Sequence, residues 1–157
     1  MSINEIHADL TSCSGRFAIV AGKFNQFITD RLISGAVDTL STYGIPETDI
    51  DCIWVPGAYE IPLTARILAE SAQYKAIIAL GAVIRGGTPH FDYVAGECAA
   101  GITRINESSH IPVIFGVLTT DTTDQAIERA GLNTNKGCEA ATAALEMVSI
   151  MSQILRK

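Results

Sequence analysis

Four short apolar runs divide the chain, and each of them is closed by residues typical of turns. The runs cover Phe17–Ala21, Cys52–Val55, Ala76–Ile84 and Pro112–Leu118. Their residues are apolar almost without interruption, which is typical of strands that are buried on both faces. The pattern therefore predicts four buried strands.

Between the runs, apolar residues recur at steps of three and four positions, which is the spacing of one face of a helix. The first stretch extends from Ile28 to Tyr43 and is followed by Gly44, a residue suited to ending a helix. Further stretches extend over 61–72, 94–105 and 141–155. No linker, low-complexity tract or repeat interrupts the chain, so we expect one domain over residues 1–157.

Strands that alternate with helices and lack a polar face predict a parallel sheet covered on both sides. Right-handed crossovers then give an α/β fold, a flavodoxin-like three-layer α/β/α sandwich with a four-stranded parallel sheet. The polar segment 1–12 has no place in such a core. Because a small sheet has open edges, we expect Met1–Leu10 to pair with the sheet edge of a neighbouring subunit.

The composition excludes several classes of protein. Apolar residues make up 48% and charged residues only 18% of the 157 positions, which argues against disorder. The formal net charge is −6 and no basic cluster is present, which argues against nucleic acid or an anionic membrane as partner. No apolar run approaches the ~20 residues of a membrane span, and the first ten residues lack a signal-peptide pattern. We therefore expect a cytoplasmic protein.

Neither a cysteine site nor a metal site is expected. The four cysteines contain no C-x-x-C pair and are interpreted as reduced, mostly buried thiols: Cys13, Cys52, Cys98 and Cys138. A nucleophilic pair of Cys98 with His90 is conceivable, but eight residues of helix separate the two by about 12 Å. The three histidines lie in unrelated segments without helical spacing, so metal binding is not predicted.

The segments that follow the expected strands are the candidate site, because ligands of parallel sheets bind beyond the carboxyl ends of the strands. These segments are Gly22–Asn25, Pro56–Glu60, Gly86–Phe91 and Thr119–Asp121. Three of the four combine glycine with an aromatic or ionisable side chain. A ligand-binding or catalytic site is therefore expected at this edge of the sheet.

Each feature of these segments has a structural interpretation beside a functional one. Phe24 is either a hydrophobic staple at the start of a helix or a stacking platform for a flat ring. Glu60 is either a first-turn carboxylate favoured by the helix dipole or an acceptor for the hydroxyl groups of a ligand. Arg129 and Lys136 are cations beside glycines, and each taken alone is best explained as a solvated charge at a helix end.

The segment GGTPHF also has both a structural and a functional interpretation. Gly86 and Gly87 either form a simple loop or direct backbone N–H groups toward an anion such as phosphate, with Arg85 and Thr88 flanking them. A histidine at a helix start more often caps the helix or fills space. Imidazole also donates and accepts protons near neutral pH, so His90 is the candidate general acid and base.

Five segments, in this order along the chain, resemble the motifs of the 6,7-dimethyl-8-ribityllumazine synthase family: KFNQFI, VPGAYEIPL, IALGAVIRGGTPHFDYVAGE, FGVLTTDTTDQAIERAG and NKGCEAATAALEM. The resemblance extends from about Arg16 to the C-terminus, and the GGTPHFDYVAGE block is highly specific. It implies condensation of 5-amino-6-(D-ribitylamino)uracil with 3,4-dihydroxy-2-butanone 4-phosphate, with release of phosphate and water. This reaction is the penultimate step of riboflavin biosynthesis and uses neither metal nor organic cofactor.

The resemblance also implies a role for individual residues. Phe24 would stack on the pyrimidine ring, and His90 would be the general acid and base. The ribityl chain and the nearby ring edge would be bound by Ala58, Tyr59 and Glu60. The backbone at the end of the third strand would meet the pyrimidine at Ala82, Val83 and Ile84. Gly87 and Thr88 would hold the butanone phosphate, assisted by Arg129, and Phe115 would close the ring pocket from an adjacent subunit together with Arg129.

The resemblance implies a homo-oligomer built from pentamers, some of which pack further into decamers or icosahedral shells. The turn AGLNTN between Arg129 and Lys136 has no long insertion, which favours a shell. The same turn is one residue shorter than is usual in bacterial members, which leaves the role of Lys136 open. Two other hypotheses remain, namely a lumazine- or flavin-binding module without catalysis and a shell-forming scaffold without activity.

Overall fold

The computed structural model describes residues 2–156, which contain a four-stranded parallel sheet. Its strands are β1 (Phe17–Gly22), β2 (Ile50–Val55), β3 (Ala76–Ile84) and β4 (Val113–Thr120). They lie in the order β2-β1-β3-β4, which is the order of flavodoxin-like folds. The predicted fold class is confirmed, although β2 begins two residues earlier and β4 ends two residues later than the apolar runs suggest.

The position of β1 inside the sheet explains why the apolar runs in the sequence are so continuous. All six of its residues are buried, and it pairs with β2 on one side and with β3 on the other. β3 is buried over most of its length between β1 and β4. Strands with a neighbour on both sides and helices on both faces have no solvated face, so their side chains are apolar throughout.

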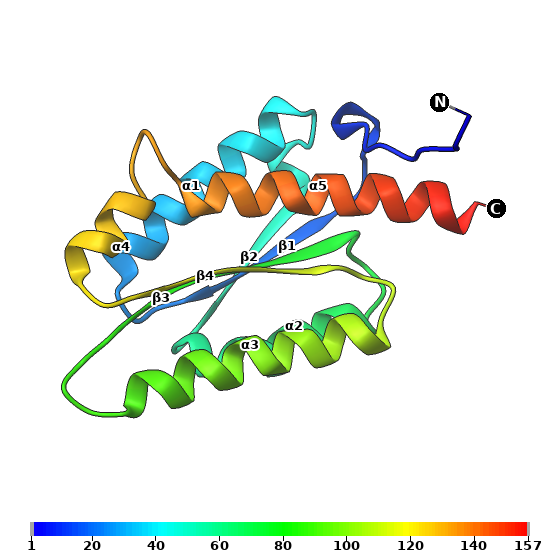
Figure 1. The fold of residues 1–157 in the computed structure, drawn as a ribbon. Helices are drawn as coiled ribbons and strands as arrows, with labels where there is room; N and C mark the ends of the chain where they lie inside the picture. Colours follow the sequence, from blue (N-terminus) through cyan, green and yellow to red (C-terminus); the bar gives the residue numbers. More distant parts are fainter. Residues whose placement is uncertain (1, 157) are drawn as a thin grey trace.

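Helices cover both faces of the sheet (Figure 1). α1 (Gln26–Thr42), α4 (Thr123–Arg129) and α5 (Lys136–Leu155) lie on one face, and α2 (Ile61–Glu70) and α3 (His90–Ser108) lie on the other. Leu32 and Leu145 are fully buried in the first layer, and Ile61 and Cys98 are fully buried in the second. Each apolar stripe is therefore buried against one face of the sheet. Within the described residues, none of the helices is long and apolar enough to cross a membrane.

The helix boundaries follow local signals. α3 and α5 begin four and five residues before the predicted stretches 94–105 and 141–155. Gly44 follows α1 with φ 96°, as predicted. α2 ends at Glu70, and Ala72, which the apolar stripe included, lies beyond the helix in a left-handed conformation with φ 57°. α4 is absent from the predicted elements, although Thr122 and Gln125 form a capping box at its start.

The N-terminal segment lies along the protein's own C-terminal helix. The Asp9 N–H donates to Ser149 Oγ at 2.8 Å, and Gln153 Nε2 donates to the carbonyl of His7 at 2.8 Å. A short 3-10 helix, η1 (Leu10–Ser12), connects this segment to β1. Met1 lies outside the described residues. Contacts within one chain do not test the pairing of this segment with a neighbouring subunit, which stays a prediction.

Two glycines allow α1 and α5 to pack closely. A Cβ atom at Gly137 would collide with the carbonyl oxygen of Leu32, and one at Gly35 would lie 2.5 Å from Asn135 Oδ1. The Asn135 side chain caps α5 by accepting from the Gly137 N–H at 2.8 Å, and it donates to the carbonyl of Arg31 at 3.1 Å. The capping residue thus bridges both helices. Its side chain fills the space beside Gly35, and the Leu32 backbone fills the space beside Gly137.

We expect Gly137→Ala to destabilise the protein, because the added methyl group meets rigid backbone. Overpacking of this kind typically costs about 1–3 kcal/mol. Gly96→Ala on α3 is the matched control, since a Cβ atom there meets nothing within 4 Å, and we expect it to stabilise the helix by about 0.5–1 kcal/mol. Urea unfolding followed by circular dichroism measures both, and equal midpoints for the two variants would contradict the packing argument.

Candidate active site

The carboxyl ends of β1, β2 and β3 open into a cleft of about 550 Å³. This volume is within the range of small-molecule sites. Nine of the residues to which the family resemblance gives a role line it: Phe24, Ala58, Tyr59, Glu60, Ala82, Val83, Ile84, Thr88 and His90. The parallel sheet thus gathers segments that are far apart in the sequence around one hollow.

The turn after β1 presents Phe24 at this cleft. The N–H groups of Lys23 and Phe24 donate to the carbonyls of Val55 and Pro56 at 2.8 and 3.1 Å, which ties the turn to the end of β2. Phe24 is 74% exposed, so its ring does not act as a hydrophobic staple in the chain itself. The ring is held at its base and leaves its surface free for another flat group.

Asn25 links this turn to the end of β3. It adopts a left-handed conformation with φ 61°, which asparagine tolerates better than most residues. Its Nδ2 donates to the carbonyl of Ala82 at 3.0 Å. The sequence analysis did not single out this residue, although its place directly after an exposed aromatic residue is a usable signal.

The segment after β2 forms a short 3-10 helix, η3 (Ala58–Glu60), that leads directly into α2. Ala58 is buried, whereas Tyr59 and Glu60 are exposed. A Cβ atom at Gly57 would lie 3.5 Å from Glu60 Oε1 and 4.0 Å from the Cβ of Phe24. The glycine therefore lies between the Glu60 carboxylate and the base of Phe24, both of which border the cleft.

The segment after β3 is open toward solvent. Neither Gly86 nor Gly87 has a positive φ, and a Cβ atom at either would meet nothing within 4 Å. The fold itself therefore does not require glycine here, and the backbone of both residues is exposed. Pro89 precedes the first residue of α3, which is His90, and the His90 side chain is exposed.

Six more residues border the cleft. Pro56, Gly57, Gly86 and Phe91 belong to the segments that the sequence placed at this edge, whereas Tyr93 and Val94 were not predicted. Tyr93 and Val94 follow His90 by three and four positions, so the three side chains share one face of α3. This helical spacing is the signal that would have found them.

Phe115 and Arg129 do not line the cleft. They border a second hollow of about 320 Å³ beside β4, together with Lys136 and Glu139. The two hollows share no lining residue. Arg129 Nη1 donates to the carbonyl of Gln125 on its own helix at 3.3 Å. A single chain therefore carries these predicted site residues in two separate groups, and the predicted Gly87 lines neither hollow.

The cysteines and histidines support no further chemistry within the described residues. No group of three or more metal-ligating side chains is present there. The expectation of mostly buried thiols was wrong in part, since Cys98 is buried, Cys13 and Cys138 are partly buried and Cys52 is exposed on the edge strand β2. Cys98 points into the core from α3, whereas His90 on the same helix is exposed, so the two do not form a catalytic pair.

Comparison with known families adds one finding. A family model described as 6,7-dimethyl-8-ribityllumazine synthase matches residues 14–152 of the 157. The matched span contains the five segments that carry the resemblance and every residue that lines the two hollows. The resemblance predicted from the sequence is thus confirmed.

We expect the Cys98 thiol to resist alkylation in the folded protein. Burial raises the pKa of Cys98 to about 12, so only about one thiol in 10⁴ is the reactive thiolate at pH 8. Iodoacetamide treatment at pH 8 followed by peptide mass spectrometry measures this, with urea-unfolded protein as the positive control. Rapid modification of Cys98 in the folded state would contradict the buried position and reopen a nucleophilic role.

Proposed function

This chain belongs to the 6,7-dimethyl-8-ribityllumazine synthase family, and from that premise we propose that it condenses 5-amino-6-(D-ribitylamino)uracil with 3,4-dihydroxy-2-butanone 4-phosphate. The family is one of transferases in riboflavin biosynthesis. The proposed product is 6,7-dimethyl-8-ribityllumazine, with phosphate and water released. The observation that carries the proposal is the cleft itself, which combines an exposed aromatic ring, a carboxylate, a glycine loop and an imidazole.

The pyrimidine substrate is proposed to lie against Phe24, whose exposed face suits offset stacking on a flat ring. The Glu60 carboxylate accepts hydrogen bonds from the ribityl hydroxyl groups, with Ala58 and Tyr59 beside the chain. The backbone of 82–84 meets the edge of the pyrimidine. The Ala82 carbonyl already accepts from Asn25 and retains a second lone pair for the substrate.

The phosphate of the second substrate is proposed to bind at the loop after β3. The open space before Gly87 allows a phosphate oxygen to approach the backbone N–H, and the Thr88 hydroxyl supplies a second donor. The loop leads directly into α3, whose positive end faces the same anion. His90 then lies next to the phosphate, close to the carbonyl that reacts.

The reaction requires protons to move at several steps. An amine of the pyrimidine attacks the ketone and gives up a proton, and the resulting hydroxyl group leaves as water to form an imine. Phosphate is then eliminated, and the ribityl-bearing amine closes the ring onto the remaining carbonyl carbon with loss of a second water. His90 is proposed to accept the proton of the attacking amine and to return it to the departing oxygen. Much of the remaining acceleration comes from holding the two substrates together in the cleft.

Phe115 and Arg129 are proposed to complete the cleft of a neighbouring copy in a homo-oligomer built from pentamers, with an icosahedral shell as the favoured larger form. The separation of the two hollows in one chain supports this arrangement. So do Leu63 and Ile67 on α2, which are more than half exposed and are suited to burial between subunits. Each chain is proposed to act as one domain over 1–157, with 1–12 against a neighbour.

The direct experiment mixes the purified protein with both substrates and follows the absorbance and fluorescence of the lumazine product. We expect a rate well above that of the spontaneous reaction. A protein that binds the product but adds nothing to the spontaneous rate would be a binding module of the same fold, and the proposed function would be wrong.

We expect His90→Ala to lower kcat by about 10²–10⁴-fold and to leave a measurable remainder, because substrate juxtaposition persists without the imidazole. His110→Ala is the matched control, since His110 is exposed in the α3–β4 connection. Initial rates over pH 6–8 test the role. Unchanged rates for His90→Ala across that range would show that another group moves the protons.

We expect Arg129→Ala to raise the KM for the phosphate substrate about ten- to hundredfold, since it removes a charge-assisted contact worth about 1.5–3 kcal/mol. Co-assembly of equal amounts of His90→Ala and Arg129→Ala chains then tests the shared site. If the two kinds of chain mix at random in a ring, about one quarter of the interfaces contain both an intact His90 and an intact Arg129. We therefore expect about one quarter of the wild-type activity. Activity no greater than that of the separate variants would assign both residues to one chain.

A further inference from the structure

Arg85 lies where β3 ends and the candidate phosphate loop begins. Its backbone N–H donates to the carbonyl of Thr120 at 2.8 Å, which continues the pairing of β3 with β4 by one residue. The N-terminal end of the loop 86–89 is therefore anchored to the sheet. The two glycines leave the rest of the loop with high conformational freedom.

The Arg85 side chain reaches the other end of the same loop. Its Nη1 donates to Asp92 Oδ1 at 3.4 Å, and its guanidinium carbon lies 4.3 Å from the centre of the Phe91 ring. Both residues belong to the first turn of α3, directly after His90. One side chain thus connects the two ends of the segment that carries Thr88 and His90.

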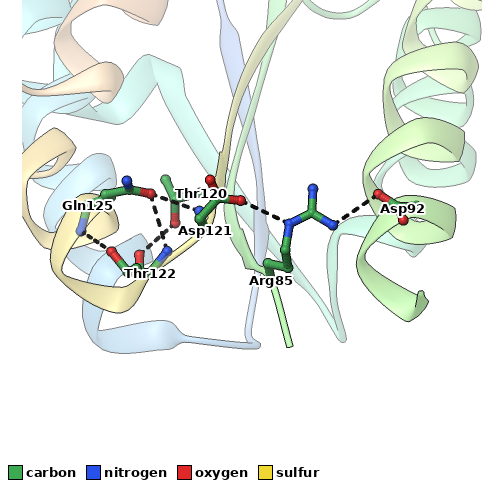
Figure 2. A network of polar contacts seen from close by, with 6 residues as sticks. All are labelled: Arg85, Asp92, Thr120, Asp121, Thr122 and Gln125. Atoms are coloured by element: carbon green, nitrogen blue, oxygen red, sulfur yellow. Dashed lines mark hydrogen bonds and ion pairs between the residues drawn. The ribbon is translucent and has the colours of Figure 1, made fainter. Parts of the chain in front are cut away.

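A third contact holds Arg85 from the opposite direction, as Figure 2 shows. Its Nε donates to Asp121 Oδ1 at 2.9 Å, and this hydrogen bond is the main reason why the pKa of Arg85 is raised. Asp121 is itself fixed, because Gln125 Oε1 accepts from the N–H groups of both Asp121 and Thr122 at 2.8 and 3.2 Å. The guanidinium therefore extends between the start of α3 and a rigid turn before α4.

The charges argue against a direct role of Arg85 as the phosphate cation. Two carboxylates face the single guanidinium, so the cluster has no positive charge left over. The side chains of Arg85, Asp92 and Asp121 are 45%, 63% and 68% exposed. Exposed ion pairs of this kind contribute little to global stability, so the effect of the cluster is local.

We propose that Arg85 is a positioning residue, which connects the start of α3 to the Asp121 turn and thereby holds Thr88 and His90 in place for the phosphate substrate. This inference rests on the proposed function for the identity of that substrate. It adds Arg85, and Asp121 as its anchor, to the residues on which the site depends. Neither residue lines the cleft, so both act through the loop.

The test compares Arg85→Gln, Asp121→Asn and the double variant in the full-length assembled protein. Arg104→Gln is the matched control, because it removes another exposed contact on α3, the 3.9 Å pair with Glu97, far along the helix from the loop. We expect both single variants to raise the KM for the phosphate substrate about three- to tenfold. The KM for the pyrimidine and the unfolding midpoint should stay within error of wild type.

The double variant decides between positioning and direct binding. If Arg85 acts through Asp121, the double variant is no worse than Arg85→Gln, because the two substitutions break the same connection. If Arg85 instead binds the phosphate, Asp121→Asn removes a competing carboxylate and lowers that KM. A lower KM for Asp121→Asn, or fully additive losses, would overturn the proposal.

Hydrogen exchange supplies a readout that does not depend on turnover. We expect amides of 86–92 to exchange about tenfold faster in Arg85→Gln and Asp121→Asn than in Arg104→Gln, and added inorganic phosphate to protect them less. Unchanged exchange in this segment would overturn the positioning role even if activity falls. A wild-type protein without turnover would reject the proposed function, while the exchange data would still decide the role of Arg85.

Discussion

Every strand of the sheet runs in the same direction, and the position of the site follows from this constraint. Parallel strands require a crossover between each pair, and their carboxyl ends meet at one edge of the sheet. The turns after β1, β2 and β3 therefore border one cleft, although more than sixty residues separate Phe24 from His90. The buried strand β1 lies at the centre of this arrangement, because it joins both halves of the sheet.

The same constraint explains why the fold was predictable. Strands buried on both faces are continuously apolar, so β1 and β3 could be identified almost to the residue. α4 was missed because its seven residues are too few for a clear apolar period, and only the capping box of Thr122 and Gln125 indicated it. Cys52 was expected to be buried, but β2 is an edge strand and most of its residues are only partly buried.

The candidate site was predictable to the extent that it lies on these turns. Phe24, Glu60 and His90 could be found from residue type and position after a strand, and the cleft indeed contains all three. Phe115 and Arg129 could be found only through the family motifs, because they border a different hollow of the chain. The Arg85 contacts could not be predicted, since they depend on how the end of β4 and the start of α3 lie relative to each other.

The proposed function requires that the loop 86–89 of one chain and Arg129 of another form a single site around both substrates. A crystal structure of the assembled protein with the pyrimidine substrate and inorganic phosphate tests it most directly. We expect phosphate on the Gly87 N–H and the Thr88 hydroxyl, within hydrogen-bond distance of Arg129 from an adjacent subunit, and the pyrimidine ring stacked on Phe24. Phosphate bound away from this loop, or held by Arg129 of the same chain, would contradict it.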